Sequence, residues 1–184
     1  MIRFFRGAVL ALMFVPSAGA AQNLDAGTAA YSSGDFETAI REWTPLAEQG
    51  DALAQFYLGS MYRDGKGVPQ DDGEAAKWYL LAGEQGNVNA QIDLGLKYGA
   101  GKGVPQDDAE AAKWFRLAAE QGEVMAQLML GFRFEQGRGV PQDGAEAMKW
   151  FRLAAEQDNA MAQKSVGSMY RDGIGVPQDD TEAV

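Results

Sequence analysis

Apolar residues recur along this chain at the spacing expected for one face of a helix. Between residues 52 and 64, Ala54, Leu58 and Tyr62 lie four residues apart, which predicts an amphipathic helix. The same places are apolar again 36 residues later, and then twice more. A fixed period of this length is typical of an array in which each unit packs against its neighbours.

A second stripe follows in each unit and is clearest between residues 108 and 121. Ala111, Phe115 and Ala118 share one face there, with Trp114 beside it. Each first helix also carries a glycine in its middle, at a cost of about 1 kcal/mol against alanine. Because glycine occupies this position in four successive units, we predict that the second helix approaches closely there. These glycines are Gly59, Gly95, Gly131 and Gly167.

One short phrase joins the two helices of each unit, and its first copy is residues 67–71, Gly-Val-Pro-Gln-Asp. Glycines such as Gly65 accept positive φ and end a helix, and a proline prevents the helix from continuing. Asp71 is placed to cap the next helix, and Glu74 three residues on predicts a reciprocal capping box. Later copies begin at Gly103, Gly139 and Gly175, and bring the caps Asp107, Asp143 and Asp179.

These patterns predict an all-α fold, a solenoid of antiparallel helix pairs with 36-residue repeats. The predicted division is a signal peptide at 1–20, a divergent first unit at 21–50, repeats at 51–86, 87–122 and 123–158, and an incomplete fourth repeat at 159–184.

The two ends depart from the pattern. The stretch Asn23–Ser33 is weakly apolar and contains Gly27, which predicts a short helix. At the other end, the fourth phrase opens a helix in whose first turn the sequence stops, at Val184. We favour a fragment of a longer array over an array that leaves Met169 and its neighbours partly bare.

Residues 1–20 have the features of a secretory signal. Arg3 and Arg6 precede the short apolar run at 7–15, and small residues at 18–20 form a cleavage site. Such a run is too short for a permanent transmembrane helix, so an uncleaved anchor is the weaker alternative. The prediction is an exported chain, periplasmic or secreted, with no transmembrane segment after cleavage.

The composition excludes several kinds of chemistry. The chain has no Cys and no His, so thiol nucleophiles, His-based triads and the usual soft metal sites are absent. Loss of residues 1–20 removes two arginines and no acid, which takes the net charge from −10 to −12. This balance argues against nucleic acid as a partner.

Paired acids at helix starts, such as Asp71-Asp72 and Asp107-Asp108, are explained as caps rather than as acid/base or metal sites. No Ser-x-x-Lys occurs, since Ser60 and Ser168 are followed three residues later by arginines. We therefore predict no catalytic residue, no cofactor and no metal.

The recurring motifs Ala-x-x-x-Leu-Gly-x-x-Tyr, Gly-x-Gly-Val-Pro-Gln-Asp and Ala-Ala-Lys-Trp-Tyr/Phe resemble the Sel-one-like repeat, a relative of the tetratricopeptide repeat. The resemblance covers residues 51–184. It implies that the helix pairs stack into a right-handed α-solenoid with a concave and a convex face. It also implies an adaptor that holds other proteins or peptides, often in bacterial envelopes.

If the first helices line the concave face, their positions off the core face form a binding groove. Apolar side chains there would mark an interaction surface, unless they pack against the neighbouring unit. The predicted groove residues are Phe56, Ser60, Arg63, Ile92, Leu96, Leu128, Phe132, Glu135, Ser168 and Arg171.

The function that follows is a non-catalytic scaffold that binds a protein or peptide segment in this groove. One alternative is an envelope enzyme, β-lactamase-like or active on peptidoglycan. Another is a fragment of a longer repeat protein whose activity lies beyond Val184. Self-association through the incomplete fourth repeat is a further partner hypothesis.

Overall fold

The structure is a computed structural model that describes residues 18–178 and 181, with side chains from Asn23 onward. Nine helices and no strand make up these residues, which confirms the all-α solenoid. Residues 1–17 of the signal predicted at 1–20 and the fourth cap pair, Asp179 and Glu182, lie outside the described residues. The helices are α1 Ala18–Ser33, α2 Phe36–Glu48, α3 Ala52–Asp64, α4 Asp72–Glu84, α5 Val88–Ala100, α6 Asp108–Glu120, α7 Val124–Gln136, α8 Gly144–Ala155 and α9 Ala160–Asp172.

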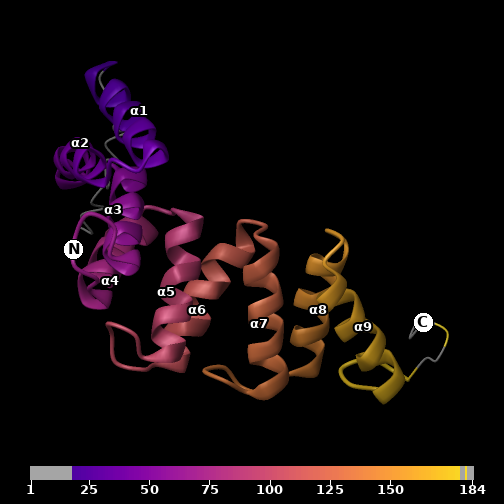
Figure 1. The fold of residues 1–184 in the computed structure, drawn as a ribbon. Helices are drawn as coiled ribbons and strands as arrows, with labels where there is room; N and C mark the ends of the chain where they lie inside the picture. Colours follow the sequence, from indigo (N-terminus) through magenta and orange to yellow (C-terminus); the bar gives the residue numbers. More distant parts are fainter. Residues whose placement is uncertain (1–17, 179–180, 182–184) are drawn as a thin grey trace, which may run out of the picture.

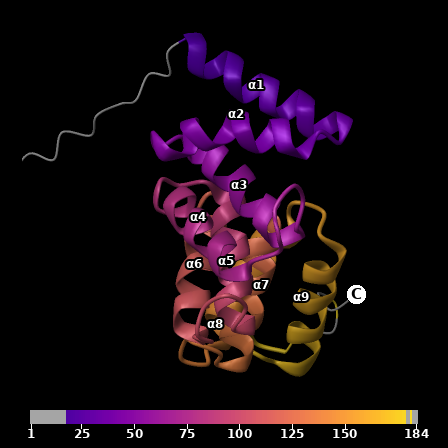
Figure 2. The same cartoon turned by 60° about the vertical axis from the view of Figure 1, so that its left-hand side comes forward.

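The helices stack in chain order as antiparallel pairs, from α1 at one end of the array to α9 at the other (Figure 1). Figure 2 shows α3, α5, α7 and α9 along one side, and the second helices α4, α6 and α8 along the other. We call the side formed by α3, α5, α7 and α9 the first-helix face. It is the side that would be concave if the resemblance to the tetratricopeptide repeat extends to its curvature.

The mid-helix glycines allow the two helices of a unit to touch, as predicted. A Cβ built on Gly95 would lie 2.7 Å from the ring of Phe115, and one on Gly59 would lie 2.6 Å from the ring of Tyr79. An aromatic ring of the second helix therefore occupies the space that a side chain would need. The hairpins between units close on residues with positive φ, including the non-glycine Asp158 at 61°.

The aspartate caps form, but the reciprocal capping box does not, and that prediction is wrong. Asp71 Oδ1 accepts from the backbone N–H groups of Gly73 and Glu74. The N–H of Asp71 donates instead to the carbonyl of Tyr62, 3.0 Å away, near the end of the preceding helix. Glu74 pairs with Lys77 on its own helix, because no free N–H is left for its carboxylate.

Helix α1 is longer than the sequence predicts, at 16 residues. The reason is a tertiary contact that outweighs the low helix propensity of Gly27. A Cβ on Gly27 would lie 2.3 Å from Trp43 Nε1, so only glycine lets α1 lie against the indole of α2. Trp43 Nε1 also donates to the carbonyl of Leu24 at 3.3 Å.

Buried polar side chains link consecutive units in a regular series. Lys97 Nζ lies 2.6 Å from Asp72 Oδ1, and one period later Arg133 Nη1 lies 2.9 Å from Asp108 Oδ1. Glutamines form a parallel ladder, in which Gln91 Nε2 donates to the carbonyl of Gly83 at 3.0 Å. These contacts satisfy buried groups between units and hold the register of the stack.

Candidate functional site

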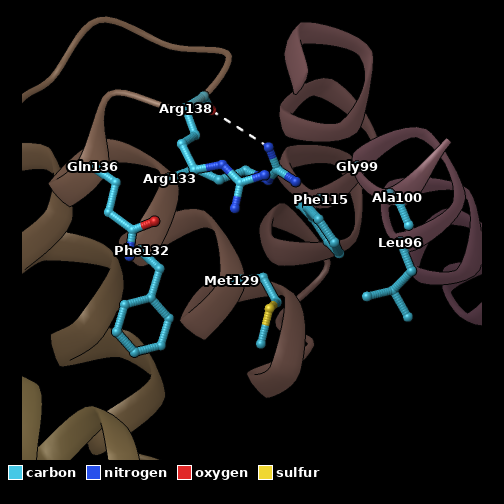
Figure 3. A pocket seen from close by; sticks show the side chains of 10 residues that line it. Leu96, Gly99, Ala100, Phe115, Met129, Phe132, Arg133, Gln136 and Arg138 are labelled. Carbon is cyan, nitrogen blue, oxygen red and sulfur yellow. Dashed lines mark hydrogen bonds between the residues drawn. The ribbon is translucent and has the colours of Figure 1, made fainter. Parts of the chain in front are cut away.

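The first-helix face is hollowed between α5 and α7. This cavity has a volume of about 240 Å³ and opens at the surface of the array (Figure 3). Helix α5 contributes Leu96 and Gly99, α6 contributes Phe115 through the gap, and α7 contributes Met129 and Phe132. We call it the α5/α7 cavity; its apolar floor suits an apolar side chain of a partner.

A second cavity of about 310 Å³ lies on the same face, between α1, α2 and α3. Its walls are largely aromatic, with Trp43 stacked on Tyr57 at a ring-centroid distance of 4.6 Å. Phe56 lies 5.8 Å from Tyr57 in the same cluster. Ser60 and Arg63 supply the polar groups of this cavity.

Arg63 belongs to a polar network that bridges α3 and α5. Its Nη1 lies 3.2 Å from both carboxylate oxygens of Asp93, and its Nε lies 2.8 Å from Asp64 Oδ1. The hydrogen bond with Asp64 raises the pKa of the Arg63 guanidinium. The Tyr79 hydroxyl lies 3.2 Å from Ser60 Oγ, and burial raises the pKa of Tyr79.

Burial also raises the pKa of the Asp93 carboxyl, although Arg63 opposes the shift. A carboxyl whose pKa is higher in the folded state lowers the stability of the fold while it is ionised. That cost disappears as the pH falls through the raised pKa.

We therefore expect the melting midpoint of Asp93→Asn, taken relative to that of the parent, to be higher at pH 7 than at pH 4. The asparagine variant carries no titrating group here, whereas the parent recovers stability as Asp93 takes up its proton. Thermal melts of both proteins across this pH range measure the difference. If the melting midpoint of the variant relative to the parent rises instead as the pH falls from 7 to 4, the assigned environment of Asp93 is wrong.

The cavities contain half of the predicted groove residues. Phe56, Ser60 and Arg63 line the cavity beside α1, and Leu96 and Phe132 line the α5/α7 cavity. Leu96 is 50% exposed and is thus available to a partner. Neither cavity includes Ile92, Glu135, Ser168 or Arg171, although all four lie on first helices.

Leu128 is a correction to the predicted groove. It is only 2% exposed and belongs to the core cluster that joins α6, α7, α8 and α9. The alternative to a groove position, packing against the neighbouring unit, therefore applies to this residue. Its side chain is already surrounded by the protein and cannot contact a partner.

Several cavity residues were not predicted from the sequence. Tyr31, Trp43 and Tyr57 line the cavity beside α1, and Met129 and Arg133 line the α5/α7 cavity. A usable signal exists for Met129, because the corresponding residue one period earlier is the charged Asp93. A break in the repeat pattern on an exposed face is the kind of position that a unit-specific site needs.

A metal site and a membrane span each have structural requirements, which the described part of the chain meets in neither case. No group of three or more acidic side chains lies close enough together to hold a metal ion among these residues. None of the described helices combines the length and the apolar character that crossing a membrane requires. What the face presents is apolar and aromatic surface with guanidinium groups, which suits binding.

Comparison with known proteins identifies the repeats. The Sel1 repeat model matches residues 52–87, 88–123, 124–159 and 160–184. The chain belongs to the Sel1 repeat family. Sel1 repeat proteins generally mediate protein–protein interactions, and the family is typically a non-catalytic scaffold.

Solved Sel1 repeat structures share this arrangement of helices. One is c5321, a protective antigen present in uropathogenic Escherichia coli strains, with an SLR fold; it is 34% identical, with a TM-score of 0.84 over 89% of this chain and 36% of that one. Another is a Sel1 repeat protein from Oxalobacter formigenes; it is 36% identical, with a TM-score of 0.81 over 85% of this chain and 65% of that one.

A curated relative matches a shorter stretch. It is named an exopolysaccharide production negative regulator, from Rhizobium leguminosarum bv. viciae, and is 43% identical over 53 residues. The match spans 29% of this chain and 20% of that protein. The Sel1 array thus covers only part of the length of such relatives.

Proposed function

We propose that this Sel1 repeat chain is a scaffold that binds a segment of a protein partner on its first-helix face. The observation that carries the proposal is the pair of cavities on this face, both lined by residues expected to form the groove. Together they offer the exposed Leu96 and several half-buried aromatic side chains for anchoring contacts. Anchors of this kind supply most of the binding energy in protein interfaces.

The matched variants Leu96→Ser and Leu81→Ser test the proposal. Both leucines are well exposed, at 50% and 44%, but Leu81 lies on the second helix α4. Partners are crosslinked to the tagged chain in its native cells and quantified by mass spectrometry. We expect Leu96→Ser to reduce recovery of one defined partner at least about fivefold, since an interface anchor contributes about 1–2 kcal/mol.

Recovery with Leu81→Ser should equal that of the parent. Equal recovery with both variants would place the binding surface elsewhere and refute the proposal. Helical circular dichroism of both proteins confirms that a loss of binding reflects the surface and not the fold.

We also propose that the scaffold acts outside the cytoplasm, on the basis of the signal-like sequence at residues 1–20. Expression of the full chain in a bacterial host should then yield an exported protein whose first residue is Ala21. N-terminal sequencing of the periplasmic fraction measures this directly. A chain that stays in the cytoplasm with residues 1–20 intact would contradict export.

A further inference from the structure

The α5/α7 cavity differs from the corresponding space one period earlier in how its two helices are bridged. The corresponding space one period earlier, between α3 and α5, is bridged by the ion pair of Arg63 and Asp93 at 3.2 Å. The residues that correspond to this pair are Gly99 and Met129, so this ion pair has no counterpart between α5 and α7. Two departures from the neighbouring unit thus leave this part of the face open.

Guanidinium groups form one edge of the cavity. The guanidinium of Arg133 lies 5.2 Å from the ring centre of Phe115. A Cβ on Gly99 would lie 2.7 Å from Arg133 Nη2. Figure 3 shows Arg133 and Arg138 side by side, with Met129 and Phe132 further round the cavity. The glycine therefore makes room for the guanidinium of Arg133 at the cavity wall.

The two arginines share a single carboxylate. Arg133 Nη1 and Arg138 Nη2 lie 2.9 and 3.2 Å from the same atom, Asp108 Oδ1. Hydrogen bonding from Arg133, together with the charge of Arg138, lowers the pKa of Asp108. Two cations against one anion leave this edge positive in a chain whose net charge is −10. Arg138 remains half exposed and can donate to a further acceptor.

We propose that the α5/α7 cavity recognises an aromatic or aliphatic side chain followed by an Asp or Glu in an internal, extended segment of the partner. The apolar side chain would lie against Leu96, Met129 and Phe132, while its acidic neighbour meets Arg138. An internal segment fits better than a chain end, because the same face continues to the cavity beside α1. The inference rests on the proposed function and adds the chemistry of the partner.

Short fluorescein-labelled peptides with blocked ends provide the probe. One carries Phe-Glu inside a Gly/Ser sequence, the second carries Phe-Gln, and the third carries Gly-Glu. Fluorescence anisotropy with the parent chain should show saturable binding of the Phe-Glu peptide, at least about tenfold tighter than that of either other peptide. Added salt should weaken this binding, because one contact is between charges.

Three substitutions can close the cavity by copying residues from the preceding unit, where the fold already accommodates them; we call this variant the graft. The variant Gly99→Arg/Met129→Asp/Arg133→Lys reproduces Arg63, Asp93 and Lys97 one period later. We expect it to lose Phe-Glu binding at least about tenfold while keeping its helical circular dichroism. A second variant, Arg138→Gln, should lose the preference for Glu over Gln. The control Arg41→Gln removes the same charge from an exposed site on α2 and should bind like the parent.

Three results would overturn the inference: no saturable binding of the Phe-Glu peptide, equal binding of the Phe-Gln peptide, or full binding by the graft. A free-ended peptide that ends in Phe and binds tighter than the blocked Phe-Glu peptide would overturn the internal segment in favour of a chain end. None of these results bears on the Leu96→Ser test with the cellular partner. Failure of the cavity chemistry is therefore distinguishable from failure of the proposed function.

Discussion

Replacing Trp114 with alanine is expected to lower the free energy of unfolding by about 3–5 kcal/mol. The indole is 4% exposed and belongs to a core cluster with Tyr79 of α4 and Leu94 of α5. A Cβ on Gly83 would lie 3.2 Å from its ring, so Trp114 fills the contact between two consecutive units. In a repeat array such contacts between neighbours carry much of the stability.

Trp78 provides the matched control, because it holds the same repeat position but is only partly buried. Trp78→Ala should therefore cost clearly less than Trp114→Ala in the same urea titration. Trp114 Nε1 is buried and has no hydrogen-bond partner among the described residues, so Trp114→Phe loses packing but no hydrogen bond. Equal losses for the two alanine variants would contradict the assignment of Trp114 to the contact between units.

Gly103→Ala is expected to cost about 3–5 kcal/mol, which combines the left-handed backbone with overpacking. Its φ is 75°, and a Cβ there would lie 2.0 Å from the backbone oxygen of Asp72 at the start of α4. A methyl group cannot occupy that space unless the backbone of one unit moves away from the other. Chemical unfolding of the purified variant measures the loss.

Gly101→Ala separates the two contributions. Gly101 has a φ of 66°, but its Cβ would lie 3.2 Å from Gln106 Cβ and 3.5 Å from the backbone nitrogen of that residue, a much milder contact. This variant should lose about 1–2 kcal/mol, chiefly the cost of the left-handed conformation. If both variants lose the same amount, the close contact between Gly103 and α4 does not limit stability.

The sequence alone predicts most of the helical framework. The 36-residue period and the phrase at 67–71 place α3, α4 and their successors, and the predicted first helix 52–64 has the observed bounds. Local rules suffice here because Asp71 caps its helix and Gly65 ends the previous one with a φ of 65°.

Tertiary contacts account for what the sequence does not predict. The glycine that begins the second copy of the phrase, Gly103, serves mainly to let the joint touch the preceding unit, and a helix-ending rule contains no such information. The length of α1 depends on the packing of Gly27 against Trp43, which lies 16 residues away in the sequence. The capping box is missing because the carbonyl of Tyr62, in the preceding helix, accepts from the N–H of Asp71 in place of the Glu74 carboxylate.

The binding face was predictable only as a set of positions. Periodicity identifies Leu96 and Leu128 as residues off the repeated core stripe, yet Leu96 is half exposed and Leu128 is buried. Side-chain packing between units decides this, and it differs from one unit to the next. The open cavity beside Leu96 follows from Gly99 and Met129, where the chain departs from its own repeat.

The central claim, that the first-helix face is the binding surface, is tested most directly by photo-crosslinking in living cells. A benzophenone amino acid replaces Leu96 on α5 in one protein and Leu117 on α6, another exposed leucine, in the other. We predict one adduct of defined mass from position 96 and none of that mass from position 117. The same adduct from position 117, with none from position 96, would show that the partner binds the second helices and would contradict this account.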